Sequence, residues 1–288
     1  MRWVEAILDE LSEATSWSYR LGAPPATEPA ATAALALAGH GRREAAERAC
    51  RWLVSLQSDD GTLGISATEP APHWPTGMAM LAWRAIGGTA DYETPMTKGL
   101  AWMLATRGET LPRSDDIGHD TTAIGWPWVE GTHAWVEPTA FNLLALKAVG
   151  HAGHPRARWA AGLLVDRLLP SGGCNYGNTV ILGQTLRAHV EPTGLALAAL
   201  AGEADPTGRI MRSMDYLSQT LDRSTTAASL AYGLMGLAAH GRVPIAASEW
   251  LASAAERTRR RGASPHRLAL LALAALGTAC PLFHGTDG

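Results

Sequence analysis

Six Ala- and Leu-rich segments recur along this chain of 288 residues, and all of them open and close in the same way. Five open at a proline, which suits the first position of a helix. Each runs toward a glycine, a residue that ends helices because it adopts a left-handed conformation freely. The openings are Pro29, Pro75, Pro138, Pro192, Thr225 and Pro265, and the closing glycines are Gly39, Gly87, Gly150, Gly202, Gly241 and Gly277. The recurrence predicts six helices of one kind, arranged as a repeat.

A second kind of segment alternates with the first. The repeated segments have middles such as AFNLLALKAV, which are apolar on nearly every side and therefore predict buried helices. The intervening segments carry an apolar stripe at helical spacing and a charged opposite face, as outer helices do. They cover residues 2–15, 43–57, 95–107, 155–169, 207–221 and 245–259.

Inner and outer helices together make six hairpins. We predict an all-α fold, an (α/α)6 toroid that forms a single domain over residues 1–288. Residues 1–20 are expected to hold the outer helix that closes the ring, and residues 278–288 to form a disordered or loosely packed tail. An open solenoid would need polar capping repeats at its ends, and the sequence has none.

The links between these helices are unequal in length. Links from inner to outer helices are short, whereas three links from outer to inner helices are long, at 58–73, 108–136 and 170–190. Links of one type lie on one face of such a ring, and long loops in a compact domain are usually functional. The same face collects the inner-helix N-termini with their partial positive charge. We therefore expect the working site on this face.

Composition narrows the function classes. The net charge of −3 gives no reason to expect a nucleic-acid partner. Cys50, Cys174 and Cys280 lie too far apart for a CxxC metal site, and their odd number argues against a disulfide framework. The N-terminus lacks the basic start and apolar run of a signal peptide, and no stretch is long enough for a membrane span. A cytoplasmic location is the resulting expectation.

Two loops resemble a known repeat. Gln57-Ser-Asp-Asp-Gly61 is similar to the Gln…Asp-Gly…Trp repeat of squalene and oxidosqualene cyclases, with Leu63 where that repeat carries Trp, and the stretch from Gly172 to Gly177 resembles its glycine half. The chain thus resembles the terpenoid cyclases and protein prenyltransferase β-subunits. That resemblance implies an α/α toroid and an apolar isoprenoid substrate in a central cavity. It also implies acid-initiated cyclisation and a helical partner subunit.

The family's acid motif is only partly matched. Asp120-Thr-Thr-Ala keeps one Asp but lies in a long loop, and Glu137-Pro-Thr-Ala has the right helical position with Glu in place of Asp. The prenyltransferase zinc motif Asp-x-Cys is missing, so no metal site is predicted from the resemblance.

Residues 115–137 form the richest candidate site. A carboxylic acid among aromatic side chains has a raised pKa and can donate a proton near neutral pH. We expect Asp120, paired with His119 or His133, to be that acid, with Glu137 as the second candidate and Asp116 nearby. Aromatic and polar side chains that would hold the substrate are Trp74, Trp126, Trp128, His133, Trp135, Tyr176 and Glu191.

Structural interpretations compete with these roles. The tryptophans at 126, 128 and 135 can simply plug the end of the ring, and His119 and His133 can anchor loops by hydrogen bonds. Glu28, Glu137 and Glu191 can serve only as helix N-terminal charges, each contributing about 0.3–1 kcal/mol. Asp115, Asp116 and Asp120 can hold Mg²⁺ through oxygen ligands or form a solvated acidic turn; no other cofactor is expected.

Three functions remain open from the sequence. The first is an isoprenoid-binding enzyme of the cyclase type. The second is a carbohydrate-active glycosidase or lyase, since toroids of this kind also host such enzymes, with a carboxylate pair drawn from Asp116, Asp120 and Glu137. The third is a non-catalytic toroid whose Trp-rich face binds a partner.

Overall fold

The computed structural model of the chain describes residues 1–87, 90–114 and 116–283. The outer helices are α1 (Arg2–Glu13), α3 (Arg43–Leu56), α5 (Glu93–Ala105), α7 (Pro155–Arg167), α9 (Arg209–Thr220) and α11 (Ala247–Arg260). The inner helices are α2 (Thr27–Gly39), α4 (Thr76–Ala85), α6 (Val136–Ala148), α8 (Val190–Ala199), α10 (Ala227–Ala239) and α12 (Pro265–Ala274). Short 3-10 helices η1 (Ala90–Tyr92) and η2 (Gly277–Ala279) and a hairpin of β1 (Val180–Ile181) and β2 (Gln184–Thr185) complete the described elements.

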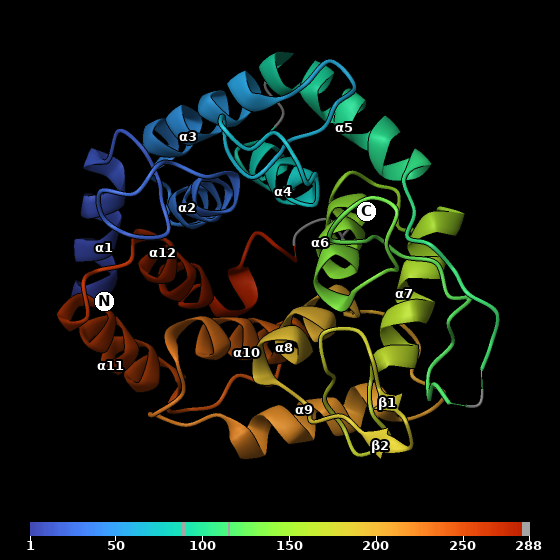
Figure 1. The fold of residues 1–288 in the computed structure, drawn as a ribbon. Helices are drawn as coiled ribbons and strands as arrows, with labels where there is room; N and C mark the ends of the chain where they lie inside the picture. Colours follow the sequence, from blue (N-terminus) through green and yellow to red (C-terminus); the bar gives the residue numbers. More distant parts are fainter. Residues whose placement is uncertain (88–89, 115, 284–288) are drawn as a thin grey trace.

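The inner helices stand around one axis, and the outer helices surround them (Figure 1). Each inner helix packs against the next one along the chain, and α12 packs against α2, which closes the ring. The outer helix α1 contacts α12, α2 and α3, and the Arg259 guanidinium of α11 bonds Glu10 at 2.5 Å. The predicted all-α toroid of six hairpins is confirmed.

The pattern of buried residues distinguishes the inner helices from the outer helices. In α6 every residue from Pro138 to Ala148 is buried, as an all-round apolar helix requires. In α9 only the stripe of Ile210, Ser213, Met214 and Leu217 is buried, so its charged face points outward.

Basic side chains tie the C-terminal ends of the inner helices together. The Lys147 ammonium donates to the carbonyl oxygens of Ala199 and Ala201 at 2.9 and 3.0 Å, and the rings of His40 and His240 bond carbonyl oxygens of α12 and α8. The Lys147 ammonium offsets the negative end of a helix dipole, and the two histidine rings satisfy carbonyl oxygens in the last turns of α12 and α8.

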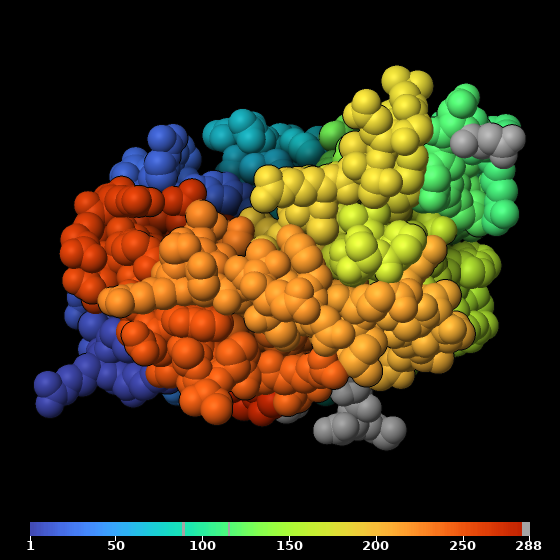
Figure 2. Space-filling model, turned by 90° about the horizontal axis from the view of Figure 1, so that it is seen from below, coloured from blue at the N-terminus to red at the C-terminus, as the bar shows by residue number. Residues whose placement is uncertain are grey.

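The three long loops lie on the opposite face, where segments of the loops 108–136 and 170–190 rise above the ring (Figure 2). Three inner helices carry a threonine in the first turn, and the hydroxyl oxygen of each accepts a hydrogen bond from a backbone N–H of a long loop. The pairs are Thr76 with Leu63, Thr139 with Trp126 and Thr193 with Cys174, at 2.9–3.0 Å. The three residues held in this way are fully buried. This contact anchors the elaborated face to the core.

The two loops that resemble the cyclase repeat share a backbone device. Gly61 and Gly172 have φ of +90° and +96°, and a Cβ at either position would lie 2.3 Å from a backbone carbonyl oxygen of the next outer helix, at Lys98 or Arg212. Gln57 adds hydrogen bonds to the carbonyls of Gly61 and Pro95. Both loops therefore dock on the following outer helix through glycine, while Leu63 fills the place expected for Trp.

Two sequence expectations differ from the structure. Helix α2 continues through Gly39, where a Cβ would lie 2.4 Å from the Leu276 side chain, and the left-handed glycine after this helix is Gly41. Residues 278–283 are not a loose tail, because Cys280 and Leu282 are 0% and 4% exposed in the core; the rest of the expected tail, 284–288, lies outside the described residues.

Candidate functional site

Three glutamates converge at the mouth of the ring. Glu28, Glu137 and Glu191 each lie in the first turn of an inner helix, α2, α6 and α8. The recurring opening of the inner helices places them at the same height, and ring closure brings them toward the axis. We call these three residues the carboxylate cluster.

The three glutamates influence one another electrostatically. Burial, followed by the negative charges of Glu191 and Glu28, raises the pKa of Glu137 to about 8. Burial and Glu28 likewise raise the pKa of Glu191, against the opposing effect of Arg267. Like charges in a half-buried space cannot all ionise cheaply, so the cluster retains a proton at neutral pH.

Glu28 has its own partners. The Tyr19 hydroxyl donates to Glu28 Oε2 at 2.5 Å, and His266 Nε2 lies 3.6 Å from Glu28 Oε1. Burial raises the pKa of Glu28, whereas the hydrogen bond from Tyr19 lowers it. Burial and the nearby Arg267 lower the pKa of His266 to about 4, so this ring is neutral at physiological pH.

Aromatic rings line the same mouth. Trp74 and Trp128 meet edge to face with centroids 4.6 Å apart, and Trp74 also lies 6.3 Å from Phe141. Phe141 in turn contacts Tyr232, a buried residue whose pKa is raised by burial and by the glutamates of the cluster. Tyr176, 39% exposed and close to the His189 ring, responds to Glu191 and Glu137 as well. The site thus joins neutral carboxyl groups to aromatic faces.

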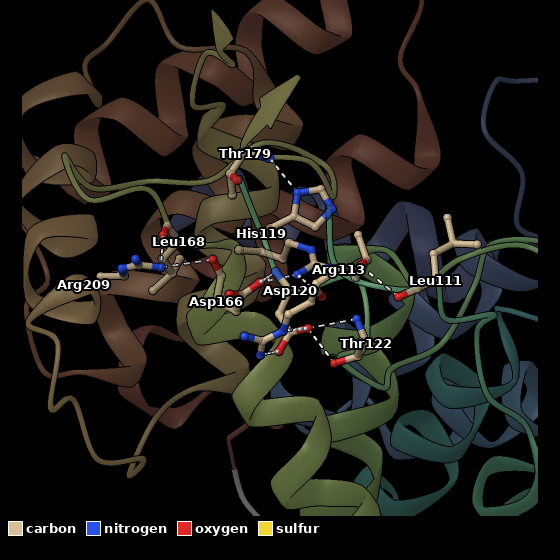
Figure 3. Close-up of polar contacts among 11 residues, drawn as sticks. Leu111, Arg113, His119, Asp120, Thr122, Asp166, Leu168, Thr179 and Arg209 are labelled. Atoms are coloured by element: carbon tan, nitrogen blue, oxygen red, sulfur yellow. Dashed lines mark hydrogen bonds and ion pairs between the residues drawn. The ribbon is translucent and has the colours of Figure 1, made fainter. Parts of the chain in front are cut away.

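Asp120, the acid favoured from the sequence, lies in a different environment (Figure 3). Its carboxylate bonds the Arg113 guanidinium and both the backbone N–H and the hydroxyl of Thr122. These hydrogen bonds lower its pKa to about 2, with the Thr122 hydroxyl as the largest cause. The expectation of a raised pKa at Asp120 is therefore wrong, because three donors stabilise its charged form.

The histidines predicted beside Asp120 are also neutral. Burial lowers the pKa of His119 to about 4, and its Nδ1 accepts the backbone N–H of Thr179 at 3.4 Å. Burial lowers the pKa of His133, whose ring lies 4.6 Å from that of Trp135. Trp135 occupies the N-cap position of α6, where its side chain makes no capping hydrogen bond.

Trp126 belongs to the core rather than to the mouth. It is 0% exposed, its indole N–H donates to the Met103 carbonyl at 3.1 Å, and the Arg156 guanidinium lies 4.0 Å from the ring centroid. Packing, and not ligand contact, explains this residue.

The acidic turn considered for Mg²⁺ is only partly described, since Asp115 lies outside the described residues. Asp116 is exposed, and its backbone N–H donates to Ser114 Oγ. In the described ranges, no group of three or more His, Cys, Asp and Glu side chains is arranged to hold a metal ion.

Sequence reasoning missed several residues of the mouth. Glu28 was interpreted as a helix-terminal charge, and Tyr19, His266, Phe141 and Tyr232 carried no motif. One signal was present in the sequence: Glu28, Glu137 and Glu191 occupy equivalent positions before a proline, and equivalent positions meet when the ring closes.

Comparisons with known proteins agree with the fold. No family model and no curated protein sequence matches the chain. A double mutant of Rex8A from Paenibacillus barcinonensis superposes with a TM-score of 0.62 at 11% identity, over 97% of this chain and 92% of that one. A reducing end xylose-releasing exo-oligoxylanase superposes with a TM-score of 0.57 at 13% identity, over 97% of this chain and 92% of that one. The C-terminal region of alpha-2-macroglobulin from Escherichia coli gives 0.55 at 14% identity, over 95% of this chain and 42% of that one.

At these identities the likeness shows the fold alone, an α/α toroid shared with glycosidases and other toroid proteins. None of these three neighbours is named as a terpenoid cyclase, so the family resemblance is supported at the level of the toroid. No helix in the described ranges is both long and apolar enough to cross a bilayer. The helical partner subunit and the cytoplasmic location remain predictions.

Proposed function

We propose that this chain is an acid–base enzyme that acts on glycosidic bonds at the mouth of the ring, with Glu137 as the general acid. The observation that carries the proposal is the raised pKa of Glu137, about 8, within a cluster of three carboxyl groups. Glycoside cleavage needs one carboxyl group that is protonated and a second that is ionised. Environments that push two neighbouring pKa values apart provide such a pair.

Glu191 is the carboxylate partner that fits best. Burial and Glu28 raise its pKa, but the positive charge of Arg267 opposes them, whereas no positive charge opposes the shift at Glu137; we therefore assign the ionised role to Glu191. In this scheme Glu137 protonates the oxygen of the leaving sugar, while ionised Glu191 activates water or attacks the sugar carbon. The edge-to-face pair of Trp74 and Trp128 offers an apolar surface for a sugar ring.

The structural neighbours lend support at the level of substrate class. One is named as a xylose-releasing exo-oligoxylanase, and a Rex8A mutant with a TM-score of 0.59 is described as complexed with xylose. We therefore take oligosaccharides, xylo-oligosaccharides first, as the substrates to test.

Substrates whose leaving groups differ in their need for a proton test whether Glu137 is the general acid. Glu137→Gln should lower the rate on unactivated oligosaccharides by about 10²–10⁴-fold, because the leaving oxygen then receives no proton. The same variant should retain most of its rate on a dinitrophenyl glycoside, whose leaving group departs without protonation. Glu191→Gln should lose both activities, and Asp120→Asn, changed away from the cluster, serves as the matched control with both activities retained. Equal losses of Glu137→Gln on both substrates would contradict the role of general acid.

A second candidate function rests on the aromatic wall. Trp74, Phe141 and Tyr232 form a continuous path of ring contacts beside the neutral carboxyl group of Glu137. Aromatic faces stabilise cations, and a neutral carboxylic acid can start a cyclisation by protonating an alkene. Incubation with linear isoprenoids, followed by analysis for cyclic products, separates this function from the first. A chain that turns over neither substrate class while binding a protein partner would favour the non-catalytic toroid.

A further inference from the structure

A hollow lies between the long loops, away from the carboxylate cluster. It has a volume of about 200 Å³ and is bounded by the loop 108–136, by the end of α7 and by residues next to the β1–β2 hairpin. His119, Arg167 and Asn178 supply polar groups to its wall, and none of the three glutamates of the cluster lines it. We call it the loop pocket; Figure 3 shows the polar contacts around it.

Arg167 lines the loop pocket and carries an unused hydrogen-bond donor. The residue is 4% exposed, and its Nη1 bonds the Asp166 carboxylate and, at 3.3 Å, the backbone carbonyl of Asp120. Its Nε is buried and has no hydrogen-bond partner among the described residues. A buried donor without a partner costs about 1–3 kcal/mol, so an acceptor oxygen placed here is stabilising.

His119 supplies a second donor. Because its Nδ1 accepts the N–H of Thr179 at 3.4 Å, the proton of the neutral ring lies on Nε2. The hydroxyl of the same Thr179 is also buried and lacks a partner among the described residues. Thr179 itself does not line the pocket, so in this part of the wall it is His119 that offers a donor to an acceptor oxygen.

Charge decides what kind of oxygen fits. Arg167 is neutralised by Asp166, and Arg113 beside it is neutralised by Asp120. The remaining charged group of the lining is Glu109, an exposed carboxylate. The pocket therefore has no surplus positive charge for an anion, and its buried guanidinium disfavours a cation. An uncharged ligand satisfies both conditions.

Most of the remaining wall is apolar. Five apolar residues, Leu111, Ile117, Ala123, Ala134 and Ile181, line the pocket, together with Thr121 and His133. The volume corresponds to roughly six or seven water-sized groups, which suits a single small ring rather than a chain of sugars. A ligand with hydroxyl groups on its edge and C–H groups on its face matches such a wall.

We propose that the loop pocket binds an uncharged polyhydroxylated molecule of monosaccharide size, with Arg167 Nε–H and His119 Nε2–H donating to its oxygen atoms. This binding site is separate from the carboxylate cluster and does not rest on the function proposed for it. A sugar held here would join the loop 108–136 to the loop 170–190 and so stiffen one side of the mouth.

The experiment is a titration of the full chain with D-xylose, D-glucose and glycerol, with sodium acetate and inorganic phosphate as charged probes. Binding is measured by calorimetry and by the NMR shifts of the His119 ring. We expect millimolar binding of at least one sugar, with a shift of the His119 signals, and no such shift with acetate or phosphate. The proposal would be overturned if only the anions shifted the NMR signals of the His119 ring. It would also be overturned if no sugar bound at a 100-fold molar excess over the protein.

Two variants locate the binding. Ala123→Leu in the loop 108–136 and Ile181→Phe in the loop 170–190 both fill the pocket. Each should weaken sugar binding at least tenfold while the thermal midpoint shows that the chain is folded. Glu137→Gln changes the mouth instead and should leave this binding unchanged; Ala152→Leu, at an exposed position, is the matched control for the added side chain. If Glu137→Gln removes binding and the filled pockets do not, the sugar sits at the mouth, which refutes the loop pocket and leaves the proposed function standing.

Discussion

Replacing Glu137 by Gln should change how the stability of the fold depends on pH. Burial raises the pKa of Glu137 from 4.5 to about 8, so the folded chain keeps a proton that the unfolded chain releases above pH 4.5. The stability contributed by that proton is complete below pH 4.5 and is lost as the pH rises toward 8. At about 1.4 kcal/mol per pH unit, the loss between pH 5 and pH 8 reaches up to about 4 kcal/mol.

The glutamine variant has no proton to lose at this position. Urea unfolding at pH 5, 6, 7 and 8 should therefore give similar free energies of unfolding for both proteins at pH 5 and a growing advantage for Glu137→Gln above it. Comparing the two proteins at each pH cancels the titrations of groups that do not interact with Glu137, such as His266, whose lowered pKa makes the fold less stable as the pH falls from 6.5 toward 4. A difference that stays constant from pH 5 to pH 8 would refute the claim that Glu137 is protonated by its surroundings.

Three further predictions concern stability. Trp126→Phe removes the indole N–H that bonds the Met103 carbonyl in the core and should cost about 2–3 kcal/mol in urea unfolding, whereas Trp159→Phe at a half-exposed position should stay within about 0.5 kcal/mol. Gly172→Ala places a Cβ 2.3 Å from the Arg212 carbonyl oxygen and should lower the free energy of unfolding by at least about 3 kcal/mol. Gly183→Ala, also at a positive φ but in open space, should lower it by only about 1 kcal/mol, and equal losses would contradict the docking role of the loop glycine. Thr193→Val removes the acceptor of the Cys174 N–H and should cost about 1–3 kcal/mol, with faster hydrogen exchange at Cys174 as the local readout.

Local sequence patterns predicted the helices well, but they did not predict which carboxyl group has a raised pKa. The buried pattern of α6 and the stripe of α9 predicted which helices are inner and which are outer, and their bounds fall within about two residues of the expected ones. Asp120 and Glu137 were both predicted as acids, yet their pKa values move in opposite directions, to about 2 and about 8. Thr122, the largest cause at Asp120, stands two residues away in the sequence, whereas burial and the distant Glu191 and Glu28, the causes at Glu137, leave no sign in the sequence around it.

Local periodicity determined the toroid, because a helix that is apolar all round must be enclosed and a helix with one apolar stripe must enclose it. The alternation of the two kinds along the chain leaves little choice but a ring of hairpins. Tertiary structure alone decided the raised pKa of Glu137. The charge of Glu137 depends on Glu28 and Glu191, which come from hairpins more than fifty residues away in either direction, and on how much water the folded mouth excludes. Desolvation and charge repulsion act through space, so they exist only once the ring has closed.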